Sequence, residues 1–344
     1  MTTWAEIDLT ALRPNTDVVR ERVAPAELLA VVKDDAYGHG LDEVTRALVG
    51  AGVTAFGALD PHTALRVRQL APDSTVFAWL FDSGDDLAAL IDAGIELGVT
   101  DLHTLERVGA IDRAAAVHLK FDSGLSRAGI RSEQWRDFVS RAAELEHAGA
   151  LRVVGVWTHI SEASEVEDTA SIARFTAAID DAVAAGLGPT IRHLAASAAS
   201  FQRADARFDR VRVGAFLYGI APGDGLGPAQ LGLRPVMTLR STVTAVDRGI
   251  ATIDYGGAAG LLTDAAGTVS VTIGGVRHPL IAVHDTHSLV DVGEATVGVG
   301  DTVTLFGSGD SGEQTLQQWA DAMGTIGEEL VTRVHPSIER RYTR

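Results

Sequence analysis

The chain has 344 residues, an apolar fraction of 46%, a formal net charge of −17 and no cysteine. The length favours two domains and the composition a globular core. The negative charge argues against nucleic-acid and anionic-membrane partners. The lack of cysteine excludes disulfides, thiol nucleophiles and iron–sulfur clusters, as expected of a cytoplasmic protein. We see no signal peptide at the start and no apolar run of the ~18 residues that a membrane span needs.

A short strand is predicted within residues 3–9, and a helical stretch opens at residue 10. Eight short apolar runs then alternate with amphipathic segments; the runs cover residues 28–32, 55–59, 76–80, 97–100, 117–121, 153–159, 191–195 and 211–216. Apolar strands separated by helices indicate a parallel sheet covered on both faces. Eight such units predict an α/β fold with a (β/α)8 barrel. A doubly wound open sheet is the alternative, favoured if the weak run 97–100 is not a strand.

The pattern changes after residues 221–228, a loop by its glycine and proline content. Strands are predicted at 236–247, 250–255, 268–273, 277–284, 288–292 and 302–306, and one helix at about 314–330. We therefore expect a barrel over residues 10–232 and a mainly β domain over residues 233–344.

Polar residues follow the predicted barrel strands, where the carboxyl ends of the strands should bring them together. They are Lys33 and Tyr37; Lys120, Asp122 and Arg127; Thr158 and His159; His193 and Ser197; and Arg212 and Gly214. Each alone has an ordinary explanation, such as a solvated charge, a core histidine or a helix-capping serine. The barrel geometry predicts that all of them lie close together at one end of the barrel, which no single motif does.

An ammonium at the end of a buried strand is costly, so Lys33 either reaches solvent or has given up its charge, for example as a Schiff base. Loops after strands seven and eight of such barrels commonly hold a phosphate, and here they carry Ser197 and Gly214. A reactive lysine, a phosphate cradle and Arg212 together fit pyridoxal 5′-phosphate (PLP).

Six segments, in order, resemble the motifs of alanine racemases, which are PLP-dependent barrel enzymes. They are Val-Val-Lys-Asp-Asp-Ala-Tyr-Gly-His-Gly at 31–40, Lys-Phe-Asp-Ser-Gly-Leu-Ser-Arg-Ala-Gly at 120–129, Thr-His at 158–159, Arg-His-Leu-Ala-Ala-Ser-Ala-Ala at 192–199, Val-Arg-Val-Gly-Ala-Phe-Leu-Tyr-Gly at 211–219 and Asp-Tyr-Gly at 254–256. The resemblance spans the chain and is strongest over about residues 1–260.

The resemblance implies a racemase that interconverts L- and D-alanine with two bases, Lys33 and Tyr255, the latter donated across a homodimer interface. It implies that the strand 3–9 belongs to the β domain and that Lys120 orients Arg127, in some relatives as a carbamate. The implied cofactor-binding residues are Lys33, Tyr37, Arg127, His159, Ser197, Arg212, Gly214, Ala215 and Tyr218. Arg127, His284 and Asp285 are the implied substrate contacts.

The sequence departs from the family pattern at four places. Asp34 and Asp35 follow the lysine in place of Ala-Asn; Ala196 replaces an asparagine; residues 261–267 lack an expected tyrosine; and Val-His-Asp-Thr-His at 283–287 replaces a Cys-Met-Asp turn. The last two gaps lie on the substrate side, so a racemase of another amino acid and a PLP-binding protein with little turnover stay open. His284 and His287 lack an obvious third ligand, and no metal site is predicted.

Overall fold

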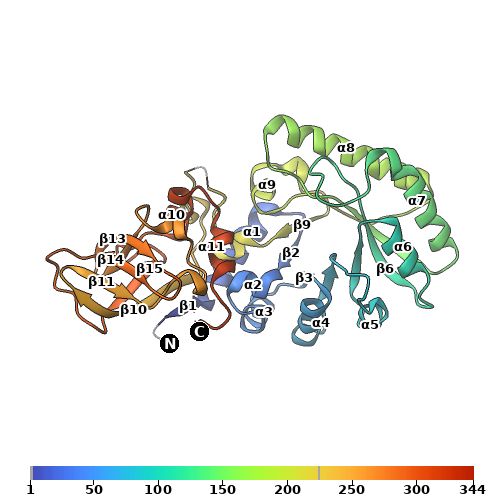
Figure 1. Ribbon diagram of the computed structural model, residues 1–344. Helices are drawn as coiled ribbons and strands as arrows, with labels where there is room; N and C mark the ends of the chain where they lie inside the picture. The colour runs from blue at the N-terminus through green and yellow to red at the C-terminus, as the bar shows by residue number, and fades with distance from the viewer. Residues whose placement is uncertain (1–2, 224) are drawn as a thin grey trace. The chain divides into compact units, whose positions relative to one another are not determined.

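The computed structural model describes residues 3–223 and 225–344 (Figure 1). The chain forms two compact units. The barrel unit comprises Val19–Lys33 and Gly52–Gly214, and the β unit comprises Met1–Val18, Asp34–Ala51 and Ala215–Arg344. Asp224, in the predicted loop 221–228, and the first two residues lie outside the described residues.

The barrel unit holds eight parallel strands in the order β8-β7-β6-β5-β4-β3-β2-β9. They are β2 (Glu27–Val31), β3 (Ala55–Leu59), β4 (Thr75–Ala78), β5 (Glu96–Val99), β6 (Ala115–Lys120), β7 (Leu151–Trp157), β8 (Ile191–His193) and β9 (Arg210–Val213). All eight predicted strands are confirmed, including the weak one that became β5. Backbone bonds from Asp209 N to Arg192 O and from Arg212 N to Ala195 O, both 3.1 Å, connect the two outermost strands. The sheet is therefore a nearly closed barrel, and the open-sheet alternative is wrong.

Six helices of this unit follow its strands: α4 (Pro61–Leu70), α5 (Leu87–Asp92), α6 (Leu102–Gly109), α7 (Ser132–His147), α8 (Glu165–Ala184) and α9 (Ser197–Gln202). In Figure 1, α6, α7 and α8 lie outside the strands. Side chains of Asp60, Asp86, Asp101 and Ser164 accept backbone N–H groups at the starts of four of them. These caps explain why the helices begin where they do.

The barrel core is filled by strand residues such as Leu29, Phe56 and Phe77, all with no exposed surface. Burying each such side chain contributes about 1.5–3 kcal/mol of hydrophobic free energy. Gly98 lies at a place where a Cβ atom would sit 2.6 Å from Trp79 Cβ. Glycine is therefore required there for the large rings of the core to pack.

The β unit holds a second eight-stranded sheet, in the order β11-β14-β13-β12-β15-β10-β1-β16. Its strands are β1 (Trp4–Asp8), β10 (Met237–Asp247), β11 (Ile250–Ile253), β12 (Ser270–Ile273), β13 (Val276–Val283), β14 (Ser288–Asp291), β15 (Thr302–Phe306) and β16 (Glu339–Thr343). Strand β1 pairs antiparallel with β10 and parallel with β16, so the two ends of the chain join one sheet. The predicted mainly β architecture of this part is confirmed.

Three local predictions need correction. The single helix expected at 314–330 is wrong: α10 (Leu316–Met323) ends at Gly324, whose left-handed φ of 67° terminates a helix, and α11 (Gly327–Arg333) follows. Strand β11 stops at Ile253, so Tyr255 lies beyond it. Strand β16 was not predicted.

The β unit also contains α3 (Leu41–Gly50), while α1 (Leu12–Val23) and α2 (Lys33–Gly38) contribute residues to both units. None of the helices in the described part of the chain is long and apolar enough to cross a membrane.

Candidate active site

The chain has only two lysines, and both lie at carboxyl ends of barrel strands. Lys33 follows β2 and Lys120 ends β6, where its Nζ lies 4.5 Å from the Trp157 ring centroid. Burial, together with the charges of Arg212 and Arg127, lowers the pKa of Lys120 to about 8. A neutral fraction of this amine therefore exists near physiological pH, which is the reactive form.

Arg212 lies fully buried at the same end of the barrel, and its contacts fix its orientation. Its Nη2 donates to the backbone oxygens of Thr158 (2.8 Å) and Leu194 (3.0 Å) and to His159 Nδ1 (3.1 Å), while Nη1 donates to His193 Nδ1 (3.0 Å). Burial lowers the pKa of Arg212 to about 9, so the guanidinium keeps its proton at neutral pH. These bonds involve only Nη1 and Nη2, so among the described residues Nε–H stays available to a ligand.

His159 shows how positive this end of the barrel is. Burial, and after it the charges of Arg212, Arg127, Lys120 and Lys33, hold the pKa of His159 well below its usual range. The imidazole is therefore neutral at physiological pH. Four cations acting on one half-buried ring mark a place that favours an anionic ligand.

Ser197 begins α9, as predicted, and the Gly214 N–H donates to its Oγ at 3.3 Å. The residue before it, Ala196, provides no side-chain cap. Glu162 Oε1 instead accepts the Ala199 N–H at 2.8 Å. The predicted phosphate contacts Ser197 and Gly214 are thus brought together in the barrel unit.

The residues directly after Lys33 form a left-handed turn. Asp34, Asp35, Ala36 and Tyr37 all have φ of 54–55° and ψ of 39–52°. This conformation costs L-residues about 1–2 kcal/mol each, so surrounding contacts must hold it. A turn this strained fixes the direction in which the chain leaves the lysine.

The contacts that hold this turn lie within the β unit. Gly40 N–H donates to Asp35 O at 3.0 Å, and the ring of His39 bonds through Nδ1 to the oxygens of Tyr37 (2.8 Å) and Ala36 (3.1 Å). Arg340 Nε donates to Gly38 O at 3.1 Å. Burial lowers the pKa of His39 to about 4.

Tyr37 and Tyr218, two predicted cofactor contacts, pack against each other with ring centroids 5.0 Å apart. The ring of His39 stacks on Tyr218 at 4.8 Å. Burial raises the pKa of both phenols, so both are neutral donors. Ala215, predicted beside them, is also buried.

Tyr255, His284 and Asp285, the predicted second base and substrate contacts, come together in the β unit. Gly257 N–H and Ala258 N–H donate to the oxygens of His284 and Asp285, both at 2.8 Å. Ser288 Oγ donates to Tyr255 O at 2.6 Å. Tyr255 is only 2% exposed, whereas His284 and Asp285 are exposed.

The charge state of Tyr255 follows from this burial. Burial raises the pKa of Tyr255, and the nearby Arg340 opposes the rise only in part. A phenol that is to accept a proton at neutral pH needs further positive charge next to it.

Sequence reasoning missed Glu96, His118 and Trp157 in the barrel unit. Glu96 and His118 form an ion-pair contact of 2.9 Å, and Trp157 lies under both Lys120 and Arg212. Side chains of a barrel strand point alternately inward and outward. This alternation along β5 and β6 was the only signal in the sequence that could have placed Glu96 and His118 inside the barrel. Across the described residues, no group of three or more His, Cys, Asp or Glu is placed to hold a metal.

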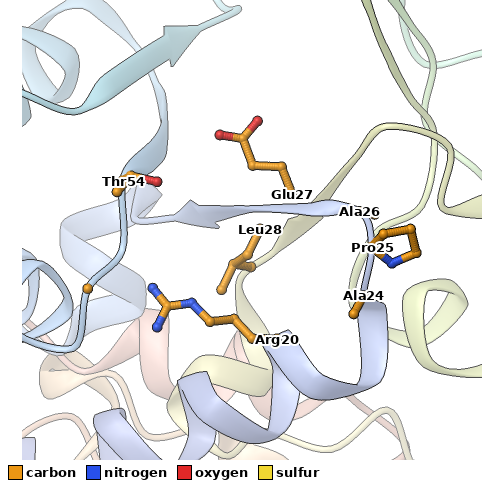
Figure 2. Close-up of a pocket in the computed structure, with 8 residues that line it drawn as sticks. Arg20, Ala24, Pro25, Ala26, Glu27, Leu28 and Thr54 are labelled. Carbon is orange, nitrogen blue, oxygen red and sulfur yellow. The ribbon is translucent and has the colours of Figure 1, made fainter.

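A cavity of about 290 Å³ lies at the start of β2, away from Lys33 and the other residues at the strand ends (Figure 2). Arg20, Pro25, Glu27 and Thr54 are among the residues that line it. Because Glu27 begins β2 and Lys33 follows its end, this cavity belongs to the opposite end of that strand. It therefore plays no part in the candidate site.

Comparisons with known proteins agree with this geometry. Residues 7–222 match the model of the alanine racemase N-terminal domain, and residues 238–342 match that of the C-terminal domain. An alanine racemase of Thermobifida fusca is 38% identical, with 98% of this chain and 97% of the relative covered. One of Streptomyces coelicolor is 36% identical, with 98% and 95% covered.

Solved structures give the same result. The crystal structure of the alanine racemase of D-cycloserine-producing Streptomyces lavendulae matches with a TM-score of 0.96 and 32% identity, covering 100% of this chain and 97% of that one. The Streptomyces coelicolor enzyme matches with a TM-score of 0.95 and 35% identity, covering 100% and 98%. Both domain models match in order along the chain, and the barrel carries the predicted lysine, arginine and histidine at its strand ends. The chain therefore belongs to the alanine racemase family.

Proposed function

We propose that this member of the alanine racemase family interconverts L- and D-alanine with PLP as its cofactor, in a homodimer of cytoplasmic location. The observation that carries the proposal is the set of groups at the strand ends of the barrel unit: Lys33 follows β2, Lys120 ends β6, and buried Arg212 contacts His159. An aldehyde with a phosphate and a ring nitrogen is the kind of ligand that these groups fit. We assign the cofactor to residues 10–232 and much of the substrate side to residues 233–344.

The residues present fit PLP. Lys33 supplies the amine that would hold the aldehyde carbon, and Ser197 Oγ and the Gly214 N–H, already 3.3 Å apart, would bind the phosphate with Tyr37, Ala215 and Tyr218. Gly214 has no side chain to cover its amide. Arg127 would contact the phenolic oxygen, and Lys120 would orient Arg127.

Arg212 and His159 would face the ring nitrogen. Arg212 offers its Nε–H, and because the guanidinium keeps its proton it would leave the ring nitrogen unprotonated. Bound PLP would make the α-proton of the amino acid acidic by drawing electron density into its ring, and an unprotonated ring would limit that effect. This favours proton transfer over side reactions.

Racemisation needs a proton removed on one face of the amino acid and returned on the other. We assign these roles to the Lys33 amine and to the Tyr255 phenol of the partner subunit, with Arg127 and the backbone of the turn at His284 and Asp285 toward the substrate carboxylate. The four tyrosines of the chain are Tyr37, Tyr218, Tyr255 and Tyr342. Of these, Tyr255 lies beside the two predicted substrate contacts, which supports the assignment.

The proposal is tested by incubating purified protein and PLP with enantiopure L-alanine and measuring the enantiomer ratio by chiral chromatography. We expect the ratio to approach one, with the same end point from D-alanine. Absence of D-alanine at every enzyme concentration would contradict the proposal.

A second candidate, racemisation of another amino acid, is favoured by the altered substrate side, where exposed His284 and Asp285 form the turn. A panel of amino acids scored for α-proton exchange in D₂O separates it from the first. A third candidate, PLP binding with little turnover, is favoured by the burial and raised pKa of Tyr255. This candidate predicts that the α-proton of the amino acid exchanges with D₂O on one face only, without conversion of one enantiomer to the other.

A further inference from the structure

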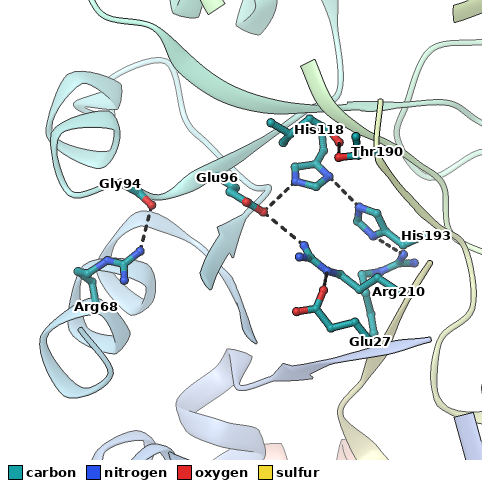
Figure 3. Close-up of polar contacts among 10 residues, drawn as sticks. Glu27, Arg68, Gly94, Glu96, His118, Thr190, His193 and Arg210 are labelled. Carbon is teal, nitrogen blue, oxygen red and sulfur yellow. Dashed lines mark hydrogen bonds and ion pairs between the residues drawn. The ribbon is translucent and has the colours of Figure 1, made fainter. Parts of the chain in front are cut away.

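A continuous chain of hydrogen bonds, buried except at its last link, runs through the barrel from Arg212 to the carboxylate of Glu96 at the start of β5. Arg212 Nη1 donates to His193 Nδ1 at 3.0 Å, and His193 Nε2 lies 3.0 Å from His118 Nδ1. His118 Nε2 lies 2.9 Å from Glu96 Oε2. Figure 3 shows the two imidazoles in line with Glu96. Residues from four different strands thus form one path.

The chain ends in a second arginine and a second carboxylate. Arg210 Nη1 lies 3.3 Å from Glu96 Oε2, and Arg210 Nε donates to Glu27 Oε2 at 2.7 Å. Arg210 is buried, whereas the Glu27 side chain is 43% exposed. Two guanidinium groups and two carboxylates therefore balance if both imidazoles are neutral.

The partners also fix which nitrogen of each ring carries the proton. An arginine can only donate, so His193 Nδ1 must accept and His193 must carry its proton on Nε2. That proton is donated to His118 Nδ1, which places the proton of His118 on Nε2, facing the Glu96 carboxylate. If His118 gained a proton, its Nδ1–H would need an acceptor, and His193 Nε2 would have to lose its proton. The proton of His193 would then lie on Nδ1, where it would face the N–H of Arg212.

The rings are also held by packing. His193 stacks on Trp157 at an interplanar angle of 6°, and Phe77 contacts both imidazoles. Gly155 leaves the space that His118 occupies, because a Cβ there would collide with His118 Nδ1. Neither ring can turn without displacing the core of the barrel.

We propose that Glu96 is a positioning residue for Arg212, acting through His118 and His193 as a hydrogen-bond chain of fixed direction. Glu96 makes His118 donate toward it, so that His118 Nδ1 accepts from His193 and His193 Nδ1 accepts from Arg212. Arg212 then stays a cation with both Nη groups held by these acceptors, so that Nε–H would be the donor offered to the ligand. This role rests on the proposed function, but the state of the chain can be measured without cofactor or substrate.

The test uses ¹⁵N-histidine-labelled full-length protein and long-range ¹H–¹⁵N correlation spectra. We expect His118 and His193 to be neutral with the proton on Nε2, and Glu96→Gln to change the nitrogen shifts of both rings. In the PLP-loaded enzyme the same variant should lower kcat about tenfold with little change in KM, as losses of residues that orient a reacting group commonly do. Unchanged His193 shifts together with unchanged kcat would overturn the proposal.

Two further variants keep the test decisive. Asp209→Asn removes a carboxylate that accepts from Arg192 at 2.6–2.8 Å outside this chain of bonds, so it should lower stability but leave the histidine shifts and kcat unchanged. If Glu96→Gln does not fold, His118→Gln interrupts the chain at a neutral link and should give the same loss of kcat. A wild-type protein without racemase activity would contradict the proposed function, while the shifts alone would still decide the role of Glu96.

Discussion

The two units build their parts of the candidate site in different ways. In the barrel unit, side chains hold one another: Arg212 is oriented by two imidazoles and two carbonyls, of which only the His159 contact is partly exposed. In the β unit, the segment around Tyr255 is held by the main chain, through bonds from Gly257 and Ala258 to the oxygens of His284 and Asp285. Main-chain bonds depend little on side-chain identity, so the segment around Tyr255 can keep this arrangement although residues 283–287 depart from the family pattern.

The largest expected effect concerns Lys33. Lys33→Ala should lower racemisation at least about 10³-fold, because it removes both the amine that holds the cofactor and one base. Borohydride reduction of the PLP-loaded protein followed by peptide mapping measures the attachment. As the chain has one other lysine, Lys120→Ala is a matched control that should keep the label at Lys33. A label found at Lys120 alone would refute the assignment.

Tyr255→Phe tests the β unit in the same way. We expect a loss of about 10²-fold in kcat, since one general base is removed while the cofactor residues remain. Exchange of the α-proton in D₂O should persist for one enantiomer of alanine and disappear for the other. Tyr342→Phe, which alters another tyrosine of the β unit, is the control. Unchanged racemisation in Tyr255→Phe would show that another group is the second base.

Acidification should weaken both units through buried neutral histidines. The pKa of His39 is about 4 in the folded protein and about 6.5 when unfolded, so the unfolded state binds more protons as the pH falls below 6.5. Stability is therefore lost on lowering the pH, by about 2 kcal/mol at pH 5 from this group alone. His118, His159 and His193 act in the same direction in the barrel unit.

Urea unfolding at pH 7.5 and pH 5.0 measures this effect. A His39→Gln variant should lose about 2 kcal/mol less than the wild type between the two pH values. An equal loss in the two proteins would mean that His39 is already exposed or charged in the folded state.

The smallest effect is expected at the start of α9. Ala196→Asn introduces a capping side chain and would ordinarily add about 1 kcal/mol of stability. Because Glu162 already accepts the Ala199 N–H, we expect a smaller gain, within about 0.5 kcal/mol. Combining it with Glu162→Ala should restore the full gain, as measured by urea unfolding. A full gain in the single variant would show that Glu162 does not cap this helix.

Much of the site could be predicted because its residues follow apolar strands. Burial on both faces makes a parallel strand a continuous apolar run, and the end of that run marks the position of residues such as Lys33, Lys120 and His159. The single helix expected at 314–330 did not take account of Gly324, although glycine commonly ends a helix. The turn at residues 34–37 could not be predicted. Its residues, Asp34, Asp35, Ala36 and Tyr37, are all L-residues, for which four successive φ angles near 55° are unfavourable.

The sequence by itself determined the eight barrel strands, the β character of the remainder and the lysine on which the chemistry depends. These follow from local patterns of apolar and polar residues, which short stretches of chain carry on their own. Only the tertiary structure decided the left-handed turn after Lys33 and the bond chain from Glu96 to Arg212. Both depend on groups that are distant in sequence, and closure of the sheet determines which side chains point inward and meet.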